Sequence, residues 1–468
     1  MSITLSIIYL IATVTFVIGL KLLGHPETAK KGNLISASGM ILAIIGTLFL
    51  HGFEDVPTIN YILIAIALLV GTILGWIIAM KVAMTKMPEL VSLFNGFGGG
   101  SALLIGLIEF SNNVGAESTE KASSAIASTI LSAIVIGSIT FTGSLVAWAK
   151  LNGSMKDVRL PKYNLINNIL FLALVAFSAY IVVLNTDSLL LIYVLLIASL
   201  IYGYLFVAPI GGADMPVVIS LLNSLTGIAA AITGVLYGNM VMIVGGILVG
   251  SAGLILTFVM CNAMNRSLTN VIFGAFGGGS DVAAASGGKV GGTIKKTTAS
   301  DSAVMMNYAN KVVIVPGYGL AVAQAQHVIH ELEEILTKKG VDVSYAIHPV
   351  AGRMPGHMNV LLAESNVDYG KLIEMDDINP QFSNTDVVLV VGANDVVNPA
   401  AHNDPSSPIY GMPILDVENA KHIIVNKRSM NAGYAGIENE LFYNQKTSML
   451  FGDAKEALTK LVAELKNM

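Results

Sequence analysis

The chain has 468 residues, of which 54% are hydrophobic and 12% are charged, and its formal net charge is -5 at pH 7. This length indicates at least two domains, and a weakly acidic balance without a basic stripe argues against nucleic acid as a partner. The single cysteine, Cys261, excludes an internal disulfide. The mean hydropathy of +0.70 averages two unlike parts, because most of the charge alternation lies after Asn310.

Apolar stretches of about twenty residues recur through the first part of the chain. As α-helices rising 1.5 Å per residue, such stretches cross a hydrocarbon core of about 30 Å. About nine spans are predicted, at residues 3–22, 34–50, 59–80, 89–108, 123–149, 165–184, 189–208, 214–237 and 240–260. The glycine run Asn95-Gly96-Phe97-Gly98-Gly99-Gly100 lowers helix propensity in the fourth span, so protein contacts must hold that helix.

The loops between these spans alternate in charge. Lysine and arginine gather after spans one, three, five and nine, whereas Lys121 is the only basic residue in the other loops. The positive-inside rule therefore predicts an N-terminus outside and a cytoplasmic location for everything after Met260. An odd number of spans agrees with this topology.

A segment rich in Gly, Ala, Ser and Thr separates the two parts. Such a composition cannot bury a core and is typical of a flexible tether. The predicted organisation is a membrane domain over 1–265, a flexible linker over 266–310 and a globular domain over 311–468. The linker either only connects the two domains or also transmits conformational change between them.

Short Val/Ile/Leu runs alternate with helical patterns after the linker. Continuous apolar runs of this kind are typical of parallel strands covered on both faces, which predicts a Rossmann-like α/β domain with a parallel sheet. Strands are predicted at 312–315, 341–347, 387–391 and 423–425 with a strand edge at 414–415, and helices at 321–336, 358–363 and 454–465.

The first predicted strand runs directly into Gly317-Tyr318-Gly319. In a dinucleotide-binding turn the first glycine makes the tight bend, the second lets the backbone approach a pyrophosphate, and a small third residue allows close helix packing. Here Leu320-Ala321-Val322-Ala323 replaces the third glycine, so the motif is a variant. A tight strand-to-helix turn without a ligand is the alternative.

The ends of two other strands indicate which nucleotide is bound. The second strand ends at His348 without the carboxylate that holds an NAD ribose, whereas the fifth runs into Lys427-Arg428-Ser429. Two cations and a hydroxyl suit a phosphomonoester, which favours NADP. Solvated surface charge is the alternative, although ligands of open α/β sheets bind at this end of the strands.

Long motifs in both parts resemble the β subunit of proton-translocating NAD(P) transhydrogenase. They lie at residues 140–144, 211–218, 316–319, 348–360, 392–400 and 427–436, so the resemblance covers nearly the whole chain. It implies that NADP(H) is bound here, while a partner α subunit binds NAD(H) and adds further membrane helices. It also implies a dimer of αβ units embedded in the lipid of the inner (plasma) membrane.

The resemblance further implies which residues hold the cofactor. Hydride passes directly between the nicotinamides, from NADH to NADP⁺, coupled to inward proton translocation, so neither a catalytic acid, base or nucleophile nor a metal is expected. The implied cofactor-binding residues are Gly317, Tyr318, Gly319, Val350, Ala351, Gly352, Arg353, Met354, Pro355, Asn394, Asp395, Val396, Val397, Asn398, Gly411, Met412, Lys427, Arg428, Ser429, Met430, Asn431, Ala432, Gly433, Tyr434, Asp453 and Ala454.

Polar residues within the spans are the candidates for a proton path, because they are costly in lipid and usually functional. The candidates are Asn95, Ser144, Asp214 and Asn223. Asn223 matches a path position of the family, with a helix–helix hydrogen bond as the alternative, and Asp214 could instead cap a helix. Asn95 stands where some bacterial members have a histidine, so the titrating group is expected in the α subunit or at His51.

A second function is compatible with the same two parts. A transporter or channel could carry an NADP-binding domain that senses redox state. The long motif that covers the nucleotide, rather than a bare glycine turn, favours the enzyme.

Overall fold

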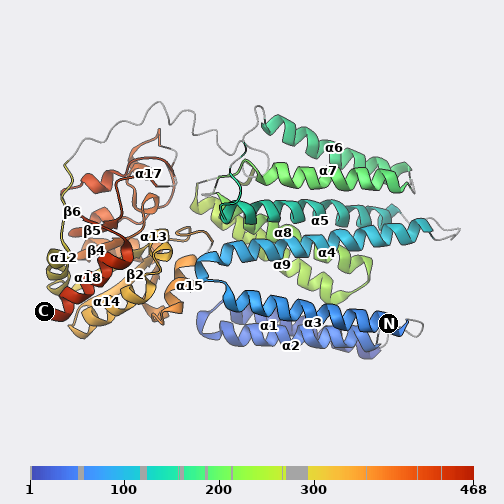
Figure 1. Ribbon diagram of the computed structural model, residues 1–468, viewed down its shortest axis with the longest axis horizontal. Helices are drawn as coiled ribbons and strands as arrows, with labels where there is room; N and C mark the ends of the chain where they lie inside the picture. The colour runs from blue at the N-terminus through green and yellow to red at the C-terminus, as the bar shows by residue number, and fades with distance from the viewer. Residues whose placement is uncertain are drawn as a thin grey trace. The chain divides into compact units, whose positions relative to one another are not determined.

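The computed structural model describes residues 3–50, 57–115, 124–156, 158, 163–184, 188–211, 214–265, 267–269, 293–354, 356–407, 409–433 and 435–468. The chain divides into two compact units. One is a bundle of long helices, and the other contains a parallel sheet between helices (Figure 1).

Nine helices in the described ranges are long and apolar enough to cross a membrane, which confirms the predicted spans. Some extend beyond the predicted stretches, because polar turns continue the helix at its ends. Their bounds are α1 Ile3–Leu23, α2 Pro26–Leu50, α3 Thr58–Lys81, α4 Met87–Gly115, α5 Ser124–Leu151, α6 Tyr163–Leu184, α7 Leu189–Val207, α8 Met215–Leu236 and α9 Met240–Ala263.

The α4 helix is continuous through its glycine run because it packs closely on α5 (Figure 1). A Cβ added at Gly99 would lie 2.8 Å from Thr140 Cβ, and one added at Gly137 would lie 2.7 Å from the Gly99 carbonyl oxygen. Small residues let two membrane helices approach at the backbone, which increases their dispersion contacts. This packing offsets the low helix propensity of the glycines.

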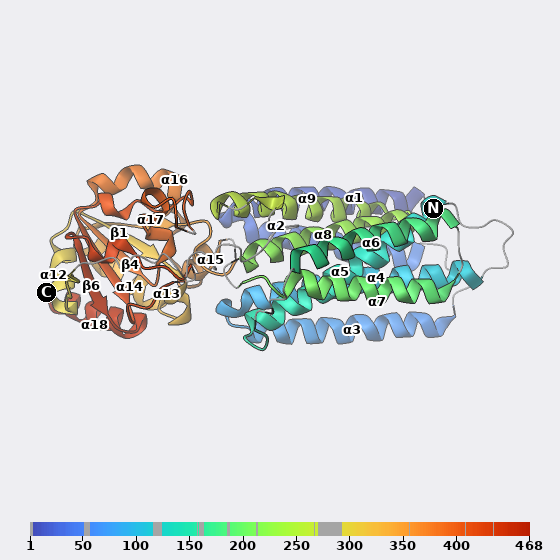
Figure 2. The ribbon, with the colours of Figure 1, turned by 90° about the horizontal axis from the view of Figure 1, so that it is seen from above.

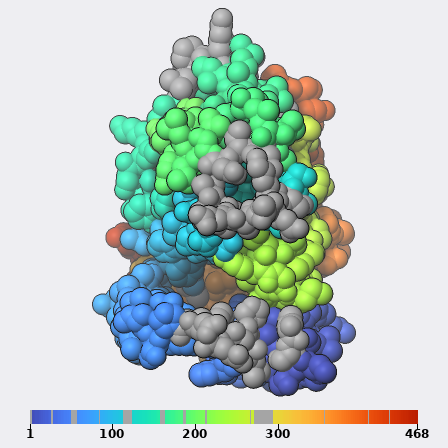
Figure 3. Space-filling view, turned by 90° about the vertical axis from the view of Figure 1, so that its right-hand side faces the viewer, coloured from blue at the N-terminus to red at the C-terminus, as the bar shows by residue number. Residues whose placement is uncertain are grey.

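The α3 helix differs from its neighbours. None of its residues is buried by the described parts of the chain, and Gly71 and Gly75 have nothing within 4 Å of an added Cβ. In the end-on view the blue helices α1–α3 lie at one edge of the bundle (Figure 3). The apolar surface of α3 is therefore left exposed by the described parts of the chain.

The second unit is a doubly wound α/β domain. Its six strands are all parallel, in the order β3-β2-β1-β4-β5-β6. This confirms the predicted parallel sheet, which Figure 2 shows between its covering helices. The strands are β1 Lys311–Pro316, β2 Asp342–Ile347, β3 Leu372–Glu374, β4 Val387–Val391, β5 His422–Lys427 and β6 Thr447–Phe451.

Alternate strand residues enter two separate cores. On one face Val312 and Ile314 pack with five helices, α12 Ala299–Asn307, α13 Tyr318–Val322, α14 Gln326–Lys338, α15 His357–Glu364 and α18 Ala454–Asn467. On the other face Val313 and Val315 pack with Phe382 and Phe442 from short helical segments. Burial on both faces explains why these strands are apolar throughout.

Two local predictions in this unit are wrong. Ile414 and Leu415 are buried but form no strand, because the Leu415 N–H donates to the Val396 carbonyl outside the ladder, at 2.9 Å. The single helix predicted at 321–336 is two helices, α13 and α14, with a break at Gln324, whose φ is +50°.

Part of the predicted linker is folded. The α12 helix begins after Thr298, whose hydroxyl oxygen accepts the Asp301 N–H at 3.1 Å, and it buries Ala303 and Met306 in the domain core. Just before it, residues 295–297 pair with Met449 of β6. The folded unit therefore includes residues before Lys311, while residues 270–292 lie outside the described ranges.

The glycine contact between α4 and α5 should control the stability of the bundle. We expect Gly137→Leu to lower it by about 1–3 kcal/mol, because the new side chain would be forced against the α4 backbone. Thermal unfolding in detergent, followed by the fluorescence of Trp76 and Trp148, measures this. Gly71→Leu is the matched control, and an equal loss in both variants would contradict the packing argument.

Candidate functional site

Most of the predicted cofactor residues gather at one edge of the sheet. Because all the strands are parallel, the loops after β1, β2, β4, β5 and β6 leave from the same side. The chain order reverses between β1 and β4, and ligands of open α/β sheets bind in the crevice at such a reversal. The loops that meet there carry residues 317–319, 350–354, 394–398, 427–433 and 453–454.

Backbone contact between two turns shapes this crevice. The Gly317 N–H donates to the Val391 carbonyl and the Gly319 N–H to the Gly392 carbonyl, both at 2.9 Å. A Cβ added at Gly319 would lie 2.6 Å from Gly392 Cα, and Gly392 itself has a φ of +68°. Glycine is thus required here for the chain to pack on itself, whether or not a ligand also approaches it.

The loop after β2 lies against the turn after β1. The Arg353 guanidinium carbon lies 4.6 Å from the centre of the Tyr318 ring, a cation–π geometry. Gly352 has a φ of +109°, a conformation that side chains other than glycine rarely adopt. Two predicted cofactor residues, Tyr318 and Arg353, therefore contact each other.

The cationic loop after β5 is partly engaged in its own structure. Lys427 Nζ donates to the Asn431 carbonyl at 2.6 Å and lies 4.7 Å from the centre of the Phe442 ring. Burial lowers the pKa of Lys427, and the Asp395 carboxylate opposes that shift. Arg428 and Ser429 are exposed, so one cation is fixed and the other faces solvent.

The loop after β5 also covers the loop after β4. The Ala435 N–H donates to Asp395 Oδ2 at 3.0 Å, and a Cβ added at Gly433 would lie 2.6 Å from Asp395 Oδ1. The buried Nδ2 of Asn394 has no hydrogen-bond partner among the described residues. A buried amide of this kind suits a polar ligand group, so these loops fit a dinucleotide.

Other predicted residues hold the loops in place. Asn398 Oδ1 accepts the Ala400 N–H and its Nδ2 donates to the Glu438 carbonyl, each at 3.1 Å. Asp453 accepts the Lys455 N–H at 3.0 Å and so caps α18. Met412 is buried, and Gly411 has a φ of +77°. The predicted residues Pro355 and Tyr434 lie outside the described ranges.

Sequence reasoning missed three residues of this edge. Gly392 closes the glycine contact, and its position directly after the apolar β4 run could have indicated it. His348 and His357 lie in the loop after β2, but a buried histidine has no distinct sequence signal. Within the described ranges no three His, Cys, Asp or Glu residues cluster as metal ligands.

In the membrane unit, polar groups of α4, α5 and α8 meet. The Ser92 hydroxyl donates to the Ser144 carbonyl at 2.9 Å, and the Thr226 hydroxyl approaches the Asn95 carbonyl at 3.3 Å. Asn95 Nδ2 and Ser144 Oγ are buried without a hydrogen-bond partner in the part of the chain that is described. Asn223 lies three residues before Thr226 and so shares its helix face.

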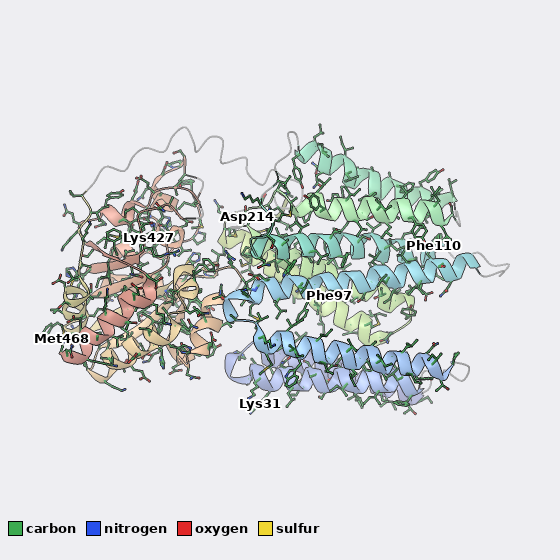
Figure 4. All side chains as sticks on the ribbon, in the orientation of Figure 1. Lys31, Phe97, Phe110, Asp214, Lys427 and Met468 are labelled. Carbon is green, nitrogen blue, oxygen red and sulfur yellow. The ribbon has the colours of Figure 1, made fainter. Side chains whose placement is uncertain are left out.

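The structure separates Asp214 from the other three proton-path candidates. It lies just before α8, where its carbonyl accepts the Val218 N–H at 3.4 Å (Figure 4). Nine residues of helix rise separate it from Asn223, or about 13 Å along the axis. Asn95, Ser144 and Asn223 therefore belong to one region of the bundle, and Asp214 to the start of α8.

Fold and site together define a membrane protein with a dinucleotide-type α/β domain. A family model described as "NAD(P) transhydrogenase beta subunit" matches residues 5–464. The curated relative "NAD(P) transhydrogenase subunit beta" of Rhodospirillum rubrum is 47% identical over 460 residues, which cover 97% of each chain, and the protein of a defined strain of that organism gives the same values. The chain belongs to the NAD(P) transhydrogenase beta subunit family, whose enzymes are oxidoreductases, and this confirms the resemblance seen in its motifs.

The glycine contact at the sheet edge leads to a prediction. Gly319→Ala should destabilise the β1–β4 region by about 1–3 kcal/mol, since its methyl group would overlap Gly392. Hydrogen exchange of peptides covering β1 and β4 should become faster.

Gly370→Ala is the matched control for this measurement. A Cβ at Gly370 would lie 3.6 Å from Asp368 Oδ1, an ordinary contact, so exchange should not change. Unchanged exchange in Gly319→Ala would show that the two turns can separate without cost.

Proposed function

We propose that the α/β domain binds NADP(H) and that hydride passes there from NADH, held by an α subunit, to NADP⁺, coupled to inward movement of protons. Membership of the family supports this proposal. The observation that carries it is that the Lys427-Arg428-Ser429 segment and the glycine turn lie at the same edge of the parallel sheet. That edge combines a place for a pyrophosphate with cations for a 2′-phosphate.

The protein's part in such a reaction is to bind and orient. Lys427, Arg428 and Ser429 would hold the 2′-phosphate, and Asn394 Nδ2 would donate to the nucleotide. The loop from Lys427 to Gly433 lies over Asn394 and Asp395, so it would exclude water from the nicotinamide half. When bound, the two nicotinamides supply the hydride donor and acceptor, so no acid or base on this chain is needed.

The membrane unit would supply the driving force. One proton moving down a gradient equivalent to about 150 mV releases about 3.5 kcal/mol, enough to bias the nucleotide ratio about 300-fold. The polar cluster of Ser92, Asn95, Ser144 and Thr226 supports a hydrated route between α4, α5 and α8. Asparagine does not titrate, so the proton-carrying group would lie elsewhere, in the α subunit or at His51, which lies outside the described ranges.

We further propose the topology and partners. The protein would lie in the inner membrane. The charges of its loops support an external N-terminus and a cytoplasmic location for the α/β domain. The division into a membrane domain, a linker and an NADP(H) domain is retained, with the folded domain extended to include α12. The exposed apolar surface of α3 supports contact with lipid or with helices of an α subunit, in a dimer of αβ units.

Nucleotide choice can be tested at the cations. Lys427→Ala with Arg428→Ala should weaken NADPH binding by several kcal/mol, since each charge-assisted phosphate contact contributes about 1.5–3 kcal/mol. Isothermal titration of NADPH into the detergent-solubilised full-length chain measures this. Lys338→Ala with Lys339→Ala removes two cations at the end of α14 and should bind normally. Equal affinity in both double variants would reject the phosphate site.

Proton coupling can be tested at Asn223. Asn223→Leu keeps a similar volume but removes the polar group, so it should leave NADPH affinity unchanged and strongly slow gradient-coupled transfer. A pH-sensitive dye in vesicles containing the complete enzyme measures proton pumping. Asn223→Gln, which keeps the amide, should retain more activity than Asn223→Leu. Pumping at the wild-type rate in Asn223→Leu would leave this residue as a helix-packing contact only.

A further inference from the structure

Two buried imidazoles hold the loop after β2 from inside. His348 and His357 are 2% and 1% exposed, and they stand at the two ends of the loop that carries residues 350–354. His348 Nδ1 accepts the Val350 N–H at 3.2 Å. His357 Nδ1 accepts the Arg353 N–H at 3.0 Å. Each histidine therefore fixes one backbone amide of a segment that the proposed function assigns to the nucleotide.

These contacts determine the protonation of both rings. A backbone N–H can only donate, so Nδ1 must be unprotonated in each ring, and a neutral ring then carries its proton on Nε2. In His348 this Nε2–H donates to the Pro413 carbonyl at 2.8 Å. His348 thus ties the loop after β2 to the segment of Gly411 and Met412, a second predicted contact of the nucleotide.

The surroundings keep both rings neutral. Burial lowers the pKa of His348 to about 4. Burial, and then the nearby charge of Arg353, lower the pKa of His357. The neutral form that the hydrogen bonds require is therefore the stable one near pH 7.

The loop is wrapped closely around His357. A Cβ added at Gly352 would lie 2.5 Å from His357 Nδ1, so the chain passes directly over the ring. The centres of the His357 and Tyr318 rings lie 6.2 Å apart, and the Arg353 guanidinium carbon lies 4.6 Å from the centre of the Tyr318 ring. Gly352, Arg353 and Tyr318 therefore all lie against the His357 imidazole.

We propose that His348 and His357 are positioning residues that hold the 350–354 loop, with Arg353 over Tyr318, in the conformation that receives NADP(H). They act through the Val350 and Arg353 amides and the Pro413 carbonyl. This inference rests on the proposed function, because it assumes that NADP(H) binds at this edge.

Two variants distinguish the effect of the His357–Arg353 hydrogen bond from the effect of the volume of the imidazole ring. His357→Leu fills the space but cannot accept from the Arg353 N–H, whereas the amide oxygen of His357→Asn can, and asparagine is tolerated at a helix start. NADPH fluorescence titrations of the detergent-solubilised full-length chain should show Kd raised about tenfold by His357→Leu, the equivalent of one lost hydrogen bond. His357→Asn should remain close to wild type.

The same comparison of an Asn variant with a Leu variant applies at His348. His348→Asn keeps the acceptor for Val350 and loses the donor to Pro413, so its Kd should lie between those of wild type and His348→Leu. His327→Leu replaces an exposed histidine on α14 and should bind as wild type does.

Each outcome has a distinct meaning. Wild-type affinity in folded His357→Leu and His348→Leu would overturn the positioning role. If those variants fail to fold, a Kd raised about tenfold in His357→Asn would overturn it instead, since the retained acceptor would then not matter. If the wild-type chain itself bound no NADPH, the proposed function would fail first and the inference with it.

Discussion

Direct approach of one backbone to another is the constraint on which both units depend. In the membrane unit Gly99 and Gly137 bring α4 and α5 together, and in the α/β unit Gly319 and Gly392 bring the turn after β1 against the turn after β4. Neither contact leaves room for a Cβ. The first contact places Ser92 and Asn95 against Ser144, and the second forms the floor of the crevice that the cofactor loops surround.

The membrane part could be predicted well from sequence because hydrocarbon thickness determines helix length. The low helix propensity of the glycine run opposes a continuous α4 helix. Close packing on α5 stabilises the helix there. The sequence did not predict which polar residues lie close together. The length of an apolar stretch predicts a membrane span, but it does not show which helices are neighbours. Asn95 and Ser144 are far apart in the sequence, yet they belong to one cluster, whereas Asp214 does not.

In the α/β part, the parallel sheet followed from the βα alternation, whereas the strand order was not predicted. The strands β3 and β6 were missed, because β3 has only three residues and β6 begins with Thr447 and Ser448. Ile414 and Leu415 showed that an apolar pair predicts burial better than it predicts ladder pairing. The loops were found, but contacts such as Lys427 to Asn431 and the two histidine acceptors depend on loop conformation, which residue types do not determine.

The pairing of residues 295–297 with β6 has a mechanical consequence. The chain arriving from α9 joins the sheet as an extended segment parallel to β6, held by hydrogen bonds to both the N–H and the carbonyl of Met449. A pull along this segment loads those bonds in shear, so they share the force instead of opening one after another. Such a force would enter at the edge strand β6, which leads within a few residues to Asp453 and α18 and is separated from β1 and the glycine turn by β5 and β4.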